Sequence, residues 1–164
     1  MQTLLPKTRE AVLAIAAWQV GTCEFPANSN KVKYNTAYYG RTVSGASYPW
    51  CMAFVWWVFR EAGFNLKKTA SCGTLTKAYK NAGQWVTEGY RPGDIVMFDF
   101  SGKRQKTEHV GIVESVSADG RTLTTIEGNT STADNSNGGE VMRRTRNVKL
   151  VTGACRPGYN SSKN

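Results

Sequence analysis

Cysteine and histidine are the residue types in this sequence that can supply a nucleophile and a base, and the chain has one histidine, His109. Cys51 stands at the predicted start of a helix, where unpaired backbone N–H groups and the helix dipole stabilise a thiolate. Beside Trp50 and Phe54, however, a buried cysteine that packs as a small apolar side chain is the commoner case. The helix on its own therefore favours a core cysteine over a nucleophile.

His109 begins a predicted strand whose side chains alternate between two faces, and a three-residue turn at 118–120 leads into a second strand over 122–126. Counting outward from this turn, His109 faces Asn129 across the hairpin, and Glu127 is its diagonal neighbour. The register therefore predicts that the three polar side chains share one face of the sheet.

A lone histidine in a strand is more often structural than catalytic, but the convergence of these three side chains favours a catalytic role for His109. An acceptor on one ring nitrogen fixes the tautomer of an imidazole, while the other nitrogen takes the proton of a nucleophile, and either Glu127 or Asn129 can be that acceptor. A cysteine at a helix N-terminus, upstream of the histidine and its polar partner, gives the papain-like order of roles. The sequence leaves the distance between Cys51 and His109 open.

The predicted elements place helices first and strands second. The helix that carries Cys51 follows Pro49, ends before Gly63 and is apolar on all sides, so we expect it at the centre of the domain. The expected elements are helices over 11–20, 50–62 and 75–83, a polar surface loop over 25–47, and strands over 95–100, 110–116, 122–126 and 141–150. This order predicts an α+β fold in which N-terminal helices pack on an antiparallel β-sheet.

The long polar loop is a candidate wall for a substrate groove, because long loops without structure of their own are often functional. Tyr34, Tyr38 and Tyr39 lie in this loop, and Trp50 directly precedes the cysteine. We expect these four aromatic side chains to bind substrate. For each tyrosine taken singly, the alternative that its ring pins the loop to the core is about as favourable.

Composition and charge set broader limits. The chain has 164 residues, 40% of them hydrophobic, and a formal net charge of +9, which fits one globular domain and excludes intrinsic disorder. The densest apolar run, 11–20, has about half of the roughly 20 residues needed to span a bilayer. Basic residues precede this run, but Glu10 interrupts them, so we expect a helix of the fold rather than a secretory signal. The positive charge favours an anionic partner, either nucleic acid or a surface polymer.

The cysteines do not predict a zinc site, since they form no CxxC pair and the chain has one histidine. Their even number permits disulfides, but a nucleophilic cysteine would leave three, so the pairing stays open. The four are Cys23, Cys51, Cys72 and Cys155.

Four segments of the sequence resemble the CHAP domain of the papain-like cysteine peptidase and amidase superfamily, namely YPWCMAFV at 48–55, GDIV at 93–96, HVGIV at 109–113 and IEGN at 126–129. The resemblance implies a single catalytic domain with a papain-like CHAP fold over residues 1–159, followed by a disordered tail at 160–164. CHAP domains of bacteria and their phages hydrolyse peptidoglycan. They cleave either the amide between muramic acid and the stem peptide or a bond within the peptides, so the resemblance implies an endolysin-like amidase or endopeptidase.

The resemblance also implies a role for each candidate residue: Cys51 is the nucleophile, His109 is the general base, and Glu127 with Asn129 orients the imidazole. It implies no organic cofactor. Some CHAP domains bind calcium through aspartates shortly before the nucleophile, but this chain has no acidic residue over 25–60, so we expect no metal site.

The expected partners are peptidoglycan and anionic wall polymers, with no nucleic acid, no membrane and a monomeric protein. A phage-encoded enzyme of this kind would be made in the host cytoplasm and act at the cell wall. Two alternatives stay open: a papain-like amidase that acts on an amide outside the wall, and a basic polymer-binding domain without catalysis. The basic residues form no compact binding motif, which weakens the second alternative: the one dense group is Arg143, Arg144 and Arg146, and such a run is usually a solvated strand face.

Overall fold

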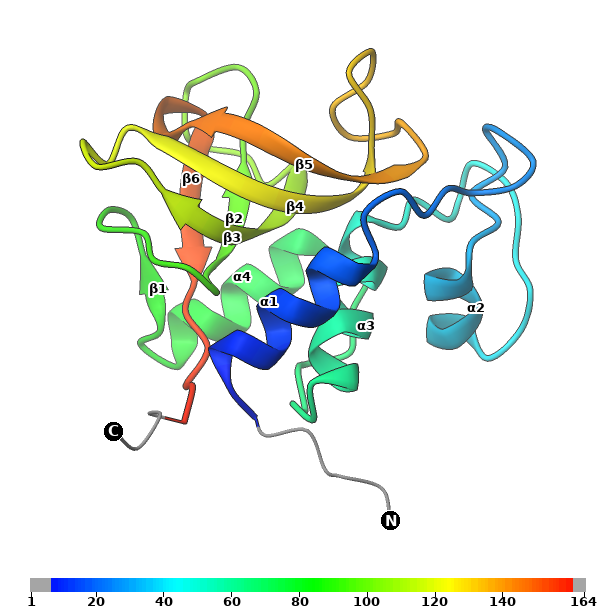
Figure 1. The fold of residues 1–164 in the computed structure, drawn as a ribbon, viewed down its shortest axis with the longest axis horizontal. Helices are drawn as coiled ribbons and strands as arrows, with labels where there is room; N and C mark the ends of the chain where they lie inside the picture. The colour runs from blue at the N-terminus through cyan, green and yellow to red at the C-terminus, as the bar shows by residue number, and fades with distance from the viewer. Residues whose placement is uncertain (1–6, 161–164) are drawn as a thin grey trace.

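The computed structural model describes residues 7–160, and within this range helices precede and cover one antiparallel sheet (Figure 1). The N-terminal half forms α1 (Arg9–Trp18), α2 (Lys33–Tyr39), α3 (Cys51–Glu61) and α4 (Cys72–Asn81). The C-terminal half forms β1 (Trp85–Val86), β2 (Ile95–Phe98), β3 (His109–Val116), β4 (Thr122–Thr130), β5 (Glu140–Asn147), a short 3₁₀ helix (Val148–Leu150) and β6 (Val151–Cys155).

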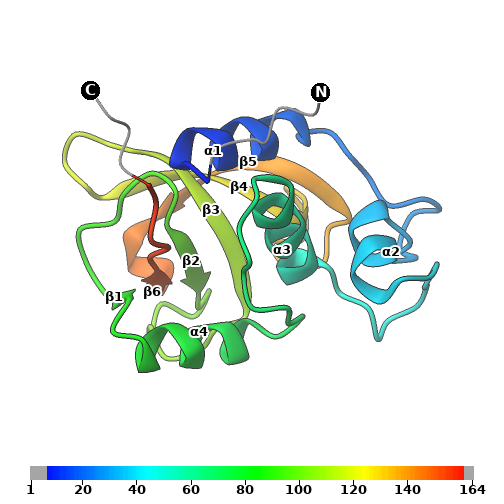
Figure 2. The ribbon, with the colours of Figure 1, turned by 90° about the horizontal axis from the view of Figure 1, so that it is seen from below.

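The strands lie in the order β1-β6-β2-β3-β4-β5, and each neighbouring pair is antiparallel. Helix α3 packs on β3 and β4, α1 packs on α3, and α4 packs on β6, so these helices gather beside the curved sheet (Figures 1 and 2). Helix α2 contacts α3 and stands farther from the sheet. The predicted α+β class, with N-terminal helices packed on an antiparallel sheet, is confirmed.

Helix α3 lies at the centre of the fold because its apolar side chains point in every direction. Trp50 is its N-cap, and Gly63, with φ of +85°, follows its end in the left-handed conformation that ends a helix without steric cost. Eight of its eleven residues are buried, including Phe54 and Phe59. The predicted central helix over 50–62 is therefore correct to within one residue at each end.

The β3–β4 turn is one residue longer than predicted. The N–H of Ser117 donates to the carbonyl of Thr122 at 2.9 Å, so residues 118–121 form the turn. The carboxylate of Asp119 accepts from the Ser117 hydroxyl at 2.6 Å and from the Arg121 N–H at 3.0 Å, and these side-chain bonds stabilise the longer turn.

A β-bulge in β3 restores the predicted register farther along the hairpin. The pairing shifts between Val113 and Ser115, where β3 carries one residue more than β4. Beyond the shift, Ile112 lies opposite Ile126, as the shorter turn had predicted. The predicted register therefore holds at Ile112, the pair of this ladder nearest to His109.

Several elements differ from their predicted bounds. The expected loop over 25–47 contains α2, and the expected strand over 141–150 ends as β5 at Asn147. Residues 148–150 form the 3₁₀ helix, and β6, which follows it, was not predicted. Strand β1 was not predicted. Most of the predicted tail, 161–164, lies outside the described residues. In the part of the chain that the structure describes, no helix has the length and apolar character to cross a membrane.

Candidate active site

Cys51 is the first residue of α3 and is 8% exposed. Its thiol pKa is lowered well below the usual range, first because the Cys72 thiol hydrogen bonds to it. Burial opposes this effect. His109 and the backbone N–H of Met52 add to the lowering, so the site favours a thiolate at Cys51.

His109 is the first residue of β3, and its imidazole is fully buried. Nε2 lies 2.8 Å from Oε1 of Glu127. Nδ1 is buried and has no hydrogen bond of ordinary geometry to residues 7–160, which leaves it available to the Cys51 sulfur. Burial opposes protonation of the ring, but hydrogen bonding and charge from Cys51 and Glu127 outweigh it and raise the pKa of His109 to about 9.

Glu127 is fully buried on β4 and stays ionised because of its partners. Arg146 donates to both of its oxygens, and the Thr125 hydroxyl donates to Oε2 at 2.5 Å. Burial favours the neutral acid, but these hydrogen bonds and the nearby charges of Arg146 and His109 hold the pKa of Glu127 at about 2. Glu127 thus presents a carboxylate, rather than a carboxylic acid, to Nε2 of His109.

Asn129 does not follow the strand alternation from which its orientation was predicted. Its φ of +58° is left-handed, and the β4–β5 register shifts between Glu127 and Thr130. Its side-chain oxygen accepts from the Gly139 N–H at 3.1 Å, and its amide nitrogen lies 3.4 Å from Oδ1 of Asn137. The hydrogen bonds of Asn129 therefore run to the β4–β5 loop, whereas Glu127 makes the contact with the imidazole.

The aromatic residues predicted to bind substrate fall into two groups. Tyr34 and Trp50 are fully buried and stacked on each other with ring centroids 5.5 Å apart, so they do not line a groove as predicted. The Tyr34 hydroxyl donates to Gln19, and the Trp50 indole N–H donates to Glu24. The Tyr34 ring thus pins the 25–47 segment to the core, which was the alternative interpretation for the tyrosines.

Tyr38 and Tyr39 are partly buried on α2 and stack edge to face, with ring centroids 4.8 Å apart. Tyr38 also packs against Trp56 of α3. Both residues are partly exposed, and their role in substrate binding stays a prediction.

Two residues beside the site were missed by sequence reasoning. Cys72 begins α4, after Ser71, whose hydroxyl caps the helix by accepting from Thr74 N–H. Arg146 was expected on a solvated face but is only 4% exposed. A start signal for α4 at Ser71 was visible in the sequence, whereas the long-range contact of Arg146 left no local signal.

The acidic residues that are buried away from the site have protein partners. Glu24 accepts from Trp50 and from Asn30 N–H, and Asp94 forms an ion pair with Arg156 at 2.9 Å. No cluster of three or more His, Cys, Asp or Glu side chains suited to a metal ion occurs within residues 7–160. All four cysteines are free thiols.

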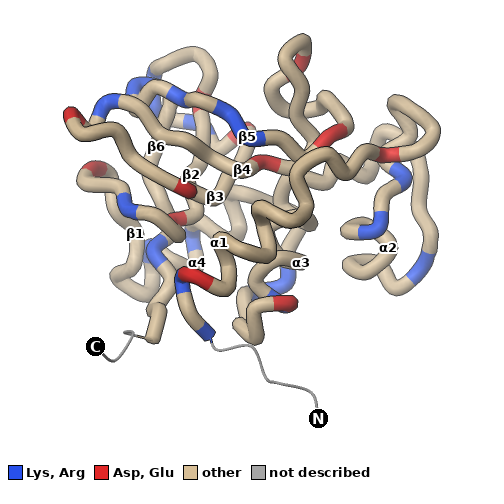
Figure 3. Tube along the Cα trace, viewed as in Figure 1, with Lys and Arg blue, Asp and Glu red and all other residues tan. Residues whose placement is uncertain are grey.

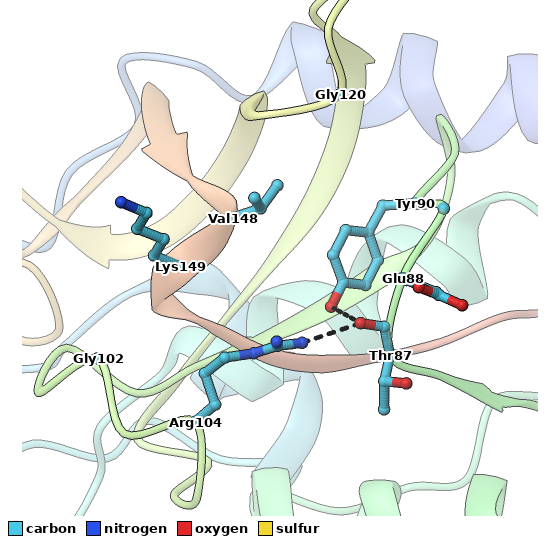
Figure 4. Close-up of a pocket in the computed structure, with 9 residues that line it drawn as sticks. Thr87, Glu88, Tyr90, Gly102, Arg104, Gly120, Val148 and Lys149 are labelled. Atoms are coloured by element: carbon cyan, nitrogen blue, oxygen red, sulfur yellow. Dashed lines mark hydrogen bonds between the residues drawn. The ribbon is translucent and has the colours of Figure 1, made fainter.

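A separate surface cavity of about 360 Å³ lies over the 3₁₀ helix and the segment that follows β1 (Figure 4). Arg104 and Tyr90 line it, and both hydrogen bond to the Thr87 carbonyl. Its lining contains none of the predicted catalytic residues, so it is distinct from the Cys51 site.

Comparison with protein families gives a match that covers the site. The model of the CHAP domain family matches residues 43–129, more than half of the chain. The matched segment contains Cys51, His109, Glu127 and Asn129 and ends before Arg146. Comparison with curated proteins gives no match.

Solved structures share the fold at low sequence identity. A wild-type endolysin, LysIME-EF1, superposes with a TM-score of 0.58 at 16% identity, over 94% of this chain and 66% of that one. Ly7917, solved with the hydrolyzing product of MDP, gives a TM-score of 0.53 at 19% identity, over 92% of this chain and 63% of that one. This chain therefore spans slightly less than two thirds of the length of these structures.

Proposed function

We propose that this chain, which belongs to the CHAP domain family, is a peptidoglycan hydrolase that cleaves an amide bond through a thioester on Cys51. The observation that carries the proposal is the contact of 2.8 Å between Nε2 of His109 and Glu127, because it leaves Nδ1 of the ring for a cysteine of lowered pKa. Two neighbours in fold support the choice of substrate: one is named an endolysin, and the other was solved with the hydrolyzing product of MDP.

In the first half of the reaction, the Cys51 thiolate attacks the carbonyl carbon of the scissile amide. Backbone N–H groups at the start of α3 are the available donors for the oxyanion that forms. The imidazolium of His109 then gives its Nδ1 proton to the leaving amine as the C–N bond breaks. The products of this half are a free amine and a thioester on Cys51.

In the second half, a water molecule takes the place of the amine. Neutral His109 removes a proton from the water as its oxygen attacks the thioester carbonyl. The C–S bond breaks, the carboxylic acid leaves, and the thiolate–imidazolium pair is restored. Glu127 stabilises the imidazolium in both halves and gives up no proton, and the cycle requires no cofactor.

We further propose that residues 1–159 act as one catalytic domain and as a monomer at the cell wall, with peptidoglycan and anionic wall polymers as partners rather than nucleic acid or a membrane. Basic residues are spread over β5, α2, α4 and other elements (Figure 3), and the chain has a formal net charge of +9. A distributed positive charge attracts an anionic matrix without requiring one compact recognition motif. An enzyme encoded by a phage would reach this matrix from the host cytoplasm.

Digestion of purified sacculi tests the proposal and identifies the bond. Mass spectrometry of the soluble fragments shows an amidase by a new amine on the first alanine and a free lactyl group, and an endopeptidase by new termini within the peptide. We expect Cys51→Ser to abolish digestion in a folded protein, because a serine hydroxyl does not ionise at neutral pH.

Cys23→Ser is the matched control, since Cys23 is an exposed free thiol whose Sγ lies 3.5 Å from Glu140. Digestion by a folded Cys51→Ser variant would refute the nucleophile. Intact sacculi after treatment with the wild type, together with hydrolysis of a small amide outside the wall, would favour the alternative amidase.

A further inference from the structure

Arg146 lies on β5 with its side chain only 5% exposed, and its guanidinium group forms an ion pair with Glu127, the carboxylate that contacts His109. Nε donates to Oε2 of Glu127 at 2.9 Å, and Nη2 donates to Oε1 at 2.6 Å. Oε1 is also the atom that lies 2.8 Å from Nε2 of His109. One carboxylate therefore joins the guanidinium group to the imidazole through a fork of two parallel bonds.

The other contacts of Glu127 complete its hydrogen bonding. Oε2 accepts from the Thr125 hydroxyl at 2.5 Å in addition to Nε of Arg146. Each oxygen thus has two donors, which fixes the plane of the carboxylate and the direction in which Oε1 faces the ring of His109.

Aromatic rings hold Arg146 and His109 on the same side of the sheet. The guanidinium carbon lies 5.4 Å and 5.1 Å from the ring centroids of Phe98 and Phe100. The imidazole of His109 lies 5.9 Å and 6.0 Å from the same two rings. Nη1 of Arg146 donates to Asn135 at 2.9 Å, so the guanidinium group is fixed at every nitrogen.

The charge of Arg146 matters because the site is buried. A carboxylate without water favours its neutral form unless an opposite charge lies beside it. A neutral Glu127 would no longer offer a negatively charged acceptor to the hydrogen bond from Nε2–H of His109. The charged and titratable groups around His109 and Glu127 are Cys51 from α3, which acts on His109, and Arg144 and Arg146 from β5, which interact with Glu127. Cys72 from α4 acts on Cys51.

We propose that Arg146 is a positioning residue: it holds the carboxylate of Glu127 ionised and in one orientation, and through Glu127 it keeps Nδ1 of His109 free for Cys51. Arg146 lies beyond the 43–129 segment that matches the family. The effect of Arg146 on turnover rests on the proposed function, but its effect on the protonation of Cys51 and His109 does not.

The first test measures the alkylation rate of Cys51 by iodoacetamide against pH, with the Cys51 peptide followed by mass spectrometry. Removing a buried positive charge favours proton uptake by the site, so we expect Arg146→Met to shift the midpoint of Cys51 reactivity upward by about one pH unit. Arg143→Met is the matched control on the same strand, since Arg143 pairs with Glu114 at 2.9 Å and its side chain is 49% exposed. The control should keep the wild-type midpoint.

Arg146→Lys separates charge from geometry, because lysine keeps the charge but not the planar fork. We expect its midpoint to stay near the wild type, while kcat on soluble wall fragments falls at least about tenfold from a loosened Glu127. If Arg146→Met fails to fold, Arg146→Lys and Thr125→Val carry the test. Thr125→Val removes one donor from Oε2 and should shift the midpoint upward by less than Arg146→Met does.

The second test uses nuclear magnetic resonance of His109, which is the one histidine of the chain. Above its pKa the wild-type ring should carry its proton on Nε2, directed at Glu127, and the Arg146 variants should show a mixture of the two tautomers. A folded Arg146 variant with the wild-type midpoint and a single Nε2–H tautomer would overturn the proposal.

Neither the alkylation nor the resonance measurement requires a wall substrate. If the Arg146 variants shift the midpoint but the wild type leaves sacculi intact, the positioning role of Arg146 stands and the hydrolase proposal is refuted. If the variants leave the midpoint and the tautomer unchanged but the wild type digests sacculi, the hydrolase proposal stands and the role of Arg146 is refuted.

Discussion

Gly111 leaves the space that the Glu127 side chain occupies. A Cβ atom built on Gly111 would lie 2.8 Å from Cγ of Glu127, a distance that requires one of the two to move. The pairing of Ile112 with Ile126 sets these residues beside each other in the β3–β4 ladder. The glycine in the HVGIV segment therefore lets the carboxylate reach His109 across the sheet.

The contacts of Glu127 and Asn129 predict unequal effects on turnover. We expect Glu127→Gln to lower kcat on soluble wall fragments by on the order of 100-fold or more, because the amide cannot stabilise the imidazolium by charge. Asn129→Ala should cost less than about tenfold, since its side chain bonds to Gly139 and Asn137 rather than to His109. Steady-state kinetics of both folded variants checks this, and a larger loss at Asn129 would contradict the assignment.

The pKa shifts predict a bell-shaped dependence of kcat/KM on pH. The active pair is the Cys51 thiolate with the His109 imidazolium. The rate should fall in acid as Cys51, whose pKa is lowered, takes up a proton, and in alkali as His109 loses its proton near pH 9, where its pKa is raised.

Glu127→Gln is the control for the alkaline limb of this profile. Loss of the carboxylate removes an anion from beside the ring, so this limb should move to lower pH. An alkaline midpoint near 6.5 in the wild type, the ordinary value for histidine, would mean that the ion pair does not form.

Cys72 is expected to tune the nucleophile rather than to replace it. Cys72→Ala removes the thiol that hydrogen bonds to Cys51, so the acid limb of Cys51 alkylation should move upward by about one pH unit. Cys72→Ser keeps a donor and should move it less. Cys155→Ala, at a fully buried thiol of β6, is the control and should leave the limb in place. A wild-type limb in Cys72→Ala would show that the contact has no effect.

Sequence reasoning placed the start of α3 and the approach of His109 to Glu127 because both depend on signals that are close together in the chain. Pro49 and Gly63 mark the ends of α3, and the alternation of β3 puts His109 and Glu127 on one face. The turn was miscounted because the side chain of Asp119 stabilises a longer loop. The bulge in β3 offset that error, and alternation alone contains no signal for it.

The remaining misses depend on contacts between distant parts of the chain. Helix α2 has no side-chain cap at Val32, and it is held by packing against α3 rather than by its own signals. Arg146 shares a dense basic run with two other arginines, so its burial against Glu127 depends on how β4 and β5 curve. The left-handed φ of Asn129, within β4, also has no signal in the strand alternation.

Net charge predicts that lysis of whole cells weakens as salt rises. A domain of formal charge +9 gains encounter rate on an anionic wall by long-range attraction, which salt screens over about 8 Å at physiological ionic strength. Hydrolysis of a small, neutral, soluble peptide is the control and should change much less. Parallel losses of both rates would place the effect of salt on the catalytic site or on stability, against steering by charge.

Chelation should leave activity in place. Calcium is bound by about six to eight oxygen ligands, usually with several carboxylates. Residues 25–60 contain no Asp or Glu and include Lys31, Lys33 and Arg41, while Glu24 is engaged by Trp50 and Asn30. Activity on sacculi after exhaustive treatment with EDTA measures this. A large loss that calcium reverses and magnesium does not would contradict the prediction.

The bulge in β3 divides the β3–β4 hairpin into two ladders with separate pairing. Between the turn and Ser115, the length of the 118–121 segment sets the register. From Val113 toward His109, the register is set by the packing of β3 and β4 on α3. A residue gained or lost at the turn can be taken up at the unpaired position between them. Insertions and deletions at this tip are thereby uncoupled from the alignment of His109 with Glu127. The turn is therefore a position where the chain can change length without displacing these two side chains.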